Sequence, residues 1–209
     1  MSAPDLAVYA DQVAVWPTAG RVVLASFDAT SVLVYQAYRE DIARFALTHQ
    51  RFGGAWSRTR MSWVKPGFLW MMYRSGWATK ADQEWVLGVR VTRAFFDDVL
   101  VAAVPTGFDA DLYPDRDAWQ QAGEHAEVRV QWDPDHDPRG APVARRALQL
   151  GLRGATLGRY ADQAVVQIDD LTPLAVAGRG VPDDRLVTPR ERPYPVPVHA
   201  RAIIPEVHP

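Results

Sequence analysis

The spacing of hydrophobic and polar positions changes along the chain, and these changes predict where strands and helices lie. An apolar run over 21–27 and a run of β-branched and aromatic residues over 31–38 flank a turn signal at 28–30, a pattern typical of a β-hairpin. The segment 39–52 then places apolar side chains three and four residues apart. This spacing predicts an amphipathic helix, which the glycine pair at 53–54 ends.

The rest of the chain continues to mix helical and strand patterns. We predict helices over 66–76, 93–103 and 152–163, a further short helix from Thr172, and strands over 84–92, 127–134 and 165–171. The segment 144–154 fits a strand or a helix, and the pattern favours a strand that ends near Gly151. Loops are predicted over 105–127, an acidic stretch, and over 133–142. Because strands and helices mix without strict alternation, the pattern favours a single domain of the α+β class.

The two ends of the chain differ from this periodic middle. Residues 1–20 show no sustained period and are predicted to form an N-terminal extension, whereas the proline-rich residues 179–209 are predicted to form an extended C-terminal tail. The core domain is therefore expected over 21–178. The start of the chain lacks the basic residues of a signal peptide, and no apolar run is long enough to span a bilayer. We therefore expect a cytoplasmic protein with no membrane partner.

Composition excludes several kinds of chemistry. The 209 residues carry a formal net charge of −2 and include no cysteine, which rules out disulfides, thiolate metal sites and a cysteine nucleophile. The chain also lacks the GxSxG, GxxxxGK[ST], GxGxxG and HExxH patterns, so a hydrolase triad, a P-loop and a zincin site are disfavoured. The alternating Asp133, Asp135 and Asp137 fail the EF-hand pattern, and we expect a polar turn there, with no metal.

The strongest local signal is the window 51–80. It combines six basic residues with aromatic side chains and contains no acidic residue. Cations neutralise phosphate, and aromatic rings stack on bases or on nicotinamide. In the predicted helix, Trp70, Tyr73 and Trp77 fall at positions i, i+3 and i+7, which is one helical face. This face either contacts a nucleotide or nucleic acid, or belongs to the hydrophobic core.

Lys65 precedes Pro66, a favoured first residue of a helix. Free N–H groups at the start of a helix attract anions, so a phosphate bound there would also meet Arg60. The alternative is an exposed lysine in a loop. The sequence does not distinguish these two arrangements.

Four segments resemble the family of domain of unknown function 4291. They are SVLVYQAY, RMSWVKPGFLWMMYRSGWATK, VRVQWDPDHD, and LQLGLRG with RYADQAVVQIDDLTPL. The resemblance extends from about Arg21 to Leu174, and its central motif is long and rich in tryptophan. The family implies no activity by itself.

The same segments also resemble, more distantly, the ADP-ribosyltransferase fold, which implies a mostly antiparallel, split central sheet flanked by helices. VYQAY at 34–38 is similar to that fold's first strand, with Gln36 in place of its ribose-orienting histidine. Tyr73 is similar to its stacking tyrosine. In LQLGL at 148–152, Gln149 is the nearest match to the glutamate that stabilises positive charge as nicotinamide leaves. Other carboxylates that could supply this charge are Asp28, Glu40 and Asp133.

This resemblance implies an enzyme that uses NAD as substrate, with a protein or nucleic-acid acceptor. It implies catalytic roles for Gln36, Tyr73 and Gln149, and cofactor contacts by Tyr35, Arg60, Trp63, Lys65, Trp70 and Arg74. Two further hypotheses remain. One is a non-catalytic module that binds RNA or single-stranded nucleic acid through 51–80, and the other is a structural or interaction protein. The sequence leaves the oligomeric state open.

Overall fold

The computed structural model describes residues 4–205 and shows a mixed α+β domain built on two five-stranded sheets. The first sheet has the strand order β10-β6-β4-β3-β12 and is antiparallel throughout. Its strands are β3 (Leu24–Phe27), β4 (Ser31–Tyr38), β6 (Trp85–Thr92), β10 (Val165–Asp170) and β12 (Arg192–Pro193). The α+β class predicted from the sequence is thus confirmed.

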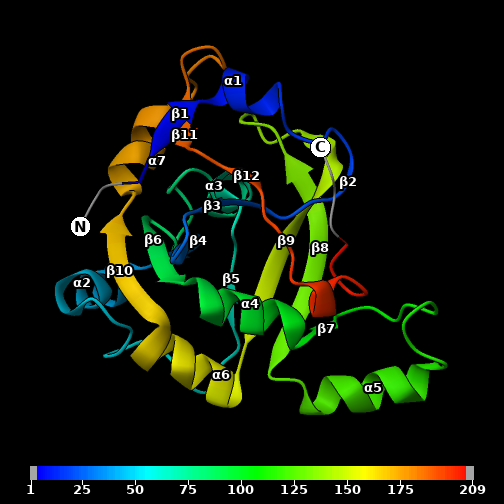
Figure 1. The fold of residues 1–209 in the computed structure, drawn as a ribbon. Coiled ribbons are helices and arrows are strands. Elements are labelled where there is room, and N and C mark those ends of the chain that lie inside the picture. Colours follow the sequence, from blue (N-terminus) through cyan, green and yellow to red (C-terminus); the bar gives the residue numbers. More distant parts are fainter. Residues whose placement is uncertain (1–3, 206–209) are drawn as a thin grey trace.

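The second sheet has the order β2-β9-β8-β7, and β5 also pairs with β9. Its strands are β2 (Gly20–Arg21), β5 (Ser62–Val64), β7 (Ala103–Pro105), β8 (Val128–His136) and β9 (Pro142–Leu152). The long β8–β9 pair forms its centre (Figure 1). The two sheets meet where the Tyr35 N–H donates to the Lys65 carbonyl at 2.7 Å and the Lys65 N–H donates back at 3.3 Å.

Helices cover the faces of these sheets. They are α1 (Tyr9–Val13), α2 (Glu40–His49), α3 (Phe68–Ser75), α4 (Arg93–Val101), α5 (Arg116–His125), α6 (Gly154–Arg159), which continues as a π-turn over Tyr160–Ala164, and α7 (Thr172–Gly178). A single 3-10 turn follows at Val198–Ala200. Gly76 ends α3 in the left-handed conformation at φ 58°, a backbone region that glycine adopts without strain.

The core lies on both faces of β4, which explains why this strand reads as a continuous apolar run. Val32 and Val34 pack into the cluster between the two sheets, and Leu33 and Tyr35 pack into a second cluster beneath α3 and α7. A strand buried on both faces needs apolar side chains at every position, because successive side chains point to opposite faces. Gln36 interrupts the run where the strand reaches the junction of the sheets.

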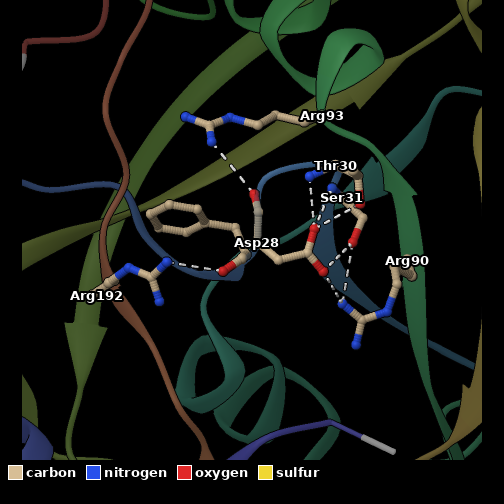
Figure 2. Close-up of polar contacts among 7 residues, drawn as sticks. Asp28, Thr30, Ser31, Arg90, Arg93 and Arg192 are labelled. Carbon is tan, nitrogen blue, oxygen red and sulfur yellow. Dashed lines mark hydrogen bonds and ion pairs between the residues drawn. The ribbon is translucent and has the colours of Figure 1, made fainter. Parts of the chain in front are cut away.

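The predicted hairpin turn at 28–30 is held by the Asp28 carboxylate (Figure 2). This carboxylate accepts hydrogen bonds from the backbone N–H and hydroxyl groups of Thr30 and Ser31, at 2.8 to 3.0 Å. Burial alone would raise the pKa of Asp28, but these hydrogen bonds outweigh it and lower the pKa to about 2. Arginines 90, 93 and 192 surround the turn.

Most predicted elements are present, and two predicted loops differ. Half of the segment predicted as a loop over 133–142 is strand, since β8 runs to His136 and β9 begins at Pro142. Only a tight turn separates them, in which Asp137 accepts from the N–H groups of Arg139 and Ala141. The acidic segment 105–127 contains α5, whose N-cap is the Asp115 side chain. Aspartate is favoured both at the N-cap of a helix and in loops, so the acidic composition of this segment did not distinguish a capped helix from a loop.

The predicted extension and tail pack against the core wherever they are described. β1 (Leu6–Val8) pairs with β11 (Val187–Pro189), so the two ends of the chain form their own small sheet. The Trp16 ring N–H donates to the Glu191 carbonyl, and Glu191 in turn accepts from the first N–H of α3 at 2.7 Å. Tyr194 lies in the core between the sheets. Residues 1–3 and 206–209 of these predicted segments lie outside the described residues.

Candidate functional site

A cavity of about 590 Å³ opens at the junction of the two sheets. Its polar lining includes Gln36 from β4, Ser62 from β5, Gln131 from β8 and Gln149 from β9, together with Lys65. Small-molecule sites are commonly clefts of about 300–1,000 Å³ that are positioned by rigid elements. Of the residues predicted from the sequence, Gln36, Arg60, Trp63, Lys65, Arg74 and Gln149 all line this one cavity.

Lys65 is the most unusual group in the cavity. It is only 6% exposed, and no residue between 4 and 205 forms a hydrogen bond or ion pair with its ammonium group. Burial, together with the positive charge of Arg74, lowers the pKa of Lys65 to about 8, although the negative charge of Asp133 acts in the opposite direction. An unpaired buried charge is costly. A side chain in this state is suited to bind an anion that enters the cavity.

Arg60 and Arg74 also line the cavity, where they are exposed and differ in their contacts. The Arg60 guanidinium has no partner within the described part of the chain, and the Arg60 backbone N–H is held by the Ser57 hydroxyl at 3.1 Å. Arg74 faces Gln83. When the Gln83 amide is oriented so that both of its polar atoms form hydrogen bonds, its oxygen accepts from the Arg74 guanidinium at 3.1 Å. The three cations Arg60, Lys65 and Arg74 therefore converge on one space, which none of the described lining residues balances with a carboxylate.

Gln36 lines the cavity but is already fully engaged by the protein. Its amide nitrogen donates to the Ser62 hydroxyl at 2.9 Å and to the Trp63 carbonyl at 3.2 Å, and its oxygen accepts from the Tyr160 hydroxyl at 2.6 Å. With 3% of its surface exposed, this side chain is a structural link between β4, β5 and the π-turn. The Gln36 amide holds Ser62 in place, and its hydrogen bonds within the protein leave it poorly suited to bind a ribose.

Two tryptophans supply ring surfaces beside the cations. Trp63 lies opposite Gly151 in the β5–β9 pairing, and a side chain at Gly151 would collide with Met61 and approach the Trp63 ring. The glycine therefore makes room for the segment that carries Trp63. Trp56 stacks on Phe52 at 5.0 Å between ring centroids and donates its ring N–H to the Tyr38 hydroxyl at 3.0 Å. Trp56 is only 6% exposed, so the partly exposed Trp63 is the ring that can stack on a planar ligand.

Tyr35, Trp70 and Tyr73 lie outside this cavity. Tyr35 is fully buried in the cluster beneath α3, with its ring 5.4 Å from that of Phe68. Tyr73 is 44% exposed, and its ring stacks on His136 at 3.5 Å between centroids. Trp70 is buried and stacks on the same histidine at 5.8 Å. The roles in nucleotide contact and stacking predicted for these three residues have no support in their positions.

Gln131 had no signal in the sequence alone, and the contacts among Gln131, Asp133 and Gln149 had none either. Gln131 reaches the cavity because β8 pairs with β9 in a register that sets it opposite Gln149. Asp133 lies two residues further along β8 and accepts from the Gln149 amide at 2.6 Å. Only the strand register, which one sequence does not show, brings these three side chains together.

The alternating acidic side chains do not form a metal site. Asp133 bonds Gln149, Asp135 bonds Arg145 within a buried ion pair at 2.9 Å, and Asp137 holds the β8–β9 turn. Over residues 4–205, no group of three or more histidine and carboxylate side chains is placed to hold a metal ion. In the same part of the chain, no helix combines the length and apolar character needed to cross a membrane.

Comparison with known proteins identifies a family and no activity. No curated protein matches the chain. The family model described as Domain of unknown function (DUF4291) matches residues 22–194, which contain every residue of the cavity discussed above. Because the match covers most of the chain and agrees with the resemblance of the four segments, this protein belongs to the DUF4291 family.

Proposed function

We propose that the cavity binds a nucleotide of the NAD type and that the protein is an ADP-ribosyltransferase-like enzyme. The observation that carries the proposal is Lys65, a buried cation without a partner in the described chain, which opens into a cavity shared with Arg60 and Arg74. Placing a pyrophosphate beside these three cations would compensate the buried charge. The partly exposed ring of Trp63 supplies a surface for adenine or nicotinamide.

The position of the cavity also supports the proposal of an ADP-ribosyltransferase-like enzyme. A mostly antiparallel architecture in which two sheets separate beside the ligand is what the resemblance to the ADP-ribosyltransferase fold implies. Here the sheets meet at Tyr35 and Lys65, and the cavity opens beside that contact. The strand β4 similar to that fold's first strand, and the strand β9 similar to its late strand, both contribute a glutamine to the lining.

A small ligand fits the charges better than an extended nucleic acid. Two exposed arginines near the cavity are already paired, Arg39 with Asp41 and Arg58 with Asp162. The Lys80 ammonium is bound to the Arg74 carbonyl. Nucleic-acid binding relies on rows of cations free to replace counterions along the backbone. Three cations of the segment 51–80 line the cavity instead, namely Arg60, Lys65 and Arg74.

Transfer would break the bond between nicotinamide and ribose. Nicotinamide leaves with the bonding electron pair, the acceptor nucleophile bonds to the ribose carbon, and the acceptor's proton passes to solvent or to a basic group. Positive charge on the ribose carbon calls for a nearby carboxylate. Gln149 is neutral, and the carboxylate hydrogen-bonded to it is Asp133. Of the acids considered from the sequence, Asp133 is therefore the one we assign to this region of the site.

Calorimetric titration of the purified protein tests binding and transfer separately. We expect saturable binding of NAD and of ADP-ribose, competition between them, and weaker binding of nicotinamide alone. Nicotinamide release in the presence of protein and RNA acceptors then tests transfer. Absence of binding by both NAD and ADP-ribose would refute the proposal, and tighter binding of single-stranded RNA than of NAD would favour the nucleic-acid hypothesis.

A further inference from the structure

Two glutamines that face one another across the β8–β9 pair share a single carboxylate. Gln131 and Gln149 are directly opposed in the strand register, and both line the cavity. The Asp133 carboxylate accepts from the Gln131 amide nitrogen at 2.8 Å and from the Gln149 amide nitrogen at 2.6 Å, one with each oxygen. One acid thus fixes two amides that come from adjacent strands.

The chemistry of the carboxylate determines which way each amide points. An ionised carboxylate only accepts hydrogen bonds, so both glutamines must turn their NH₂ groups toward Asp133. Their carbonyl oxygens are then directed elsewhere, and neither oxygen accepts a hydrogen bond from any residue in the range 4–205. Gln36 provides the contrast, because both atoms of its amide are bound within the protein. Among these three glutamines of the lining, the amide oxygens without a hydrogen bond are therefore those of Gln131 and Gln149.

We propose that Asp133 positions the carbonyl oxygens of Gln131 and Gln149 as a pair of acceptors for two neighbouring hydroxyl groups of a ribose. This inference rests on the proposed nucleotide site and specifies which part of the nucleotide is recognised. Directly opposed residues in an antiparallel pair have Cβ atoms about 5 Å apart, so two amide side chains bonded to one acid lie side by side. That separation suits adjacent donors on one sugar ring.

The neighbouring cations make a ribose the best donor for this pair. Lys65 lies close enough to Asp133 for that carboxylate to raise the lysine pKa, so anion-binding and hydroxyl-accepting groups adjoin one another. In a nucleotide, phosphate and ribose hydroxyls are joined on one sugar in the same way. A site whose acceptors expect a hydroxyl discriminates strongly against an analogue that lacks it, because the acceptors are then left unpaired.

The test measures affinity for NAD and for two analogues, each lacking the 2′-hydroxyl of one of the two riboses. For the wild-type protein, we expect one analogue to bind at least about tenfold more weakly than NAD, which corresponds to about 1.4 kcal/mol. In Asp133→Asn the asparagine can accept from one glutamine but must donate to the other, which reverses that amide. The preference for NAD over the same analogue should then fall to within about twofold. Gln149→Met, which removes one acceptor and keeps Asp133, should lower the preference as well.

Asp169→Asn is the matched control. Asp169 accepts from Gln167 at 2.5 Å, the same arrangement two residues apart on a strand, but neither residue lines the cavity. This variant should keep the full preference. Equal loss of preference in both aspartate variants would overturn the inference, as would equal binding of NAD and both deoxy analogues.

Two other outcomes separate this inference from the proposed function. If the protein discriminates only against an NAD analogue with nicotinic acid in place of nicotinamide, the two glutamines bind the carboxamide group of NAD. That result would overturn ribose recognition and leave nucleotide binding intact. Failure of the wild-type protein to bind NAD and ADP-ribose would refute the proposed function, and the ribose assignment with it.

Discussion

Two groups of basic residues lie on this fold, and they use their charges in opposite ways. Around the β3–β4 turn, Arg90 lies 3.7 Å from the Asp28 carboxylate, and Arg93 and Arg192 donate to main-chain carbonyls of residues 28 and 27 (Figure 2). The guanidinium groups of the latter two also lie over the Phe27 ring, at 5.4 and 3.9 Å from its centroid. In the cavity, Lys65 is more buried than these arginines and has no comparable partner within residues 4–205.

The difference separates basic residues that stabilise the fold from those available to a ligand. Each arginine at the turn already contacts a carboxylate, a carbonyl or a ring face, so it contributes fully to the stability of the ligand-free protein. In the cavity, the buried ammonium group of Lys65 carries a desolvation cost that a bound anion would relieve. Variants in the two regions should therefore fall into different classes, one that alters stability and one that alters affinity.

The largest expected effect comes from Lys65→Met. Loss of a charge-assisted contact to the pyrophosphate should weaken NAD binding about 30- to 100-fold. The free energy of unfolding without ligand should stay the same or rise, since the variant removes a buried unpaired charge and retains an apolar chain. Calorimetry and denaturant unfolding measure the two quantities.

Lys80→Met is the control for that variant, because it makes the same substitution in the same basic window. The Lys80 ammonium binds the Arg74 carbonyl and does not line the cavity. We expect NAD affinity within about twofold of wild type. Equal losses in the two variants would mean that general positive charge, and not the buried amine, attracts the ligand.

The pH dependence of binding should follow Lys65. The pKa of its amine is about 8 in the free protein, so NAD affinity should be highest below pH 8 and fall about tenfold per pH unit above it. Stability should change in the opposite direction. The unfolded amine titrates near 10.5, so between about pH 8 and 10.5 the unfolded chain binds more protons, and wild-type stability should rise with pH relative to Lys65→Met. A binding profile that is flat between pH 7 and 9.5 would exclude Lys65 as the ligand's partner.

At the turn, Asp28→Ala should reduce stability and leave NAD affinity unchanged. The variant removes the acceptor for Thr30 and Ser31, and because the carboxylate is half exposed we expect a loss of only about 1–2 kcal/mol at pH 7. The pKa of Asp28 is about 2 against 3.8 for the free side chain, so its contribution is present above about pH 4 and disappears as the pH falls toward 2. Denaturation at pH 7 and at pH 2 should show the difference between variant and wild type shrinking.

The sequence predicted the parts of the site that lie within one segment of the chain, and it did not predict the contacts made by strands from elsewhere. Helix and strand periods located β4, α2 and α3, and the basic window contained Arg60, Lys65 and Arg74. The sequence did not show that these cations meet a glutamine pair from β8 and β9, because that depends on the register of strands distant from the window.

Local geometry explains why some of the predicted residues lie outside the cavity. Tyr35 and Gln36 are adjacent in a strand, so their side chains point to opposite faces and only one of them can line the cavity. Trp70, Tyr73 and Trp77 were assigned to one helical face, but α3 ends at Ser75 and Trp77 adopts a positive φ of 55° beyond the helix. Since residues 68–72 are all buried, the pattern in this short helix does not identify a single buried face.

The smallest expected effect on NAD affinity is that of a substitution at Arg58. This substitution distinguishes a small-ligand site from a nucleic-acid surface most clearly. Arg58 forms a two-pronged ion pair with Asp162, at 2.7 and 2.8 Å, on the exposed side of the cavity segment. Because Asp162 already occupies this guanidinium, Arg58→Gln should change NAD affinity by less than about twofold. A nucleic-acid surface would instead recruit Arg58 as one of several phosphate contacts, and the salt dependence of RNA binding would become less steep in the variant. Measuring NAD affinity and the salt slope for single-stranded RNA on the same preparation shows which class of ligand this side of the molecule serves.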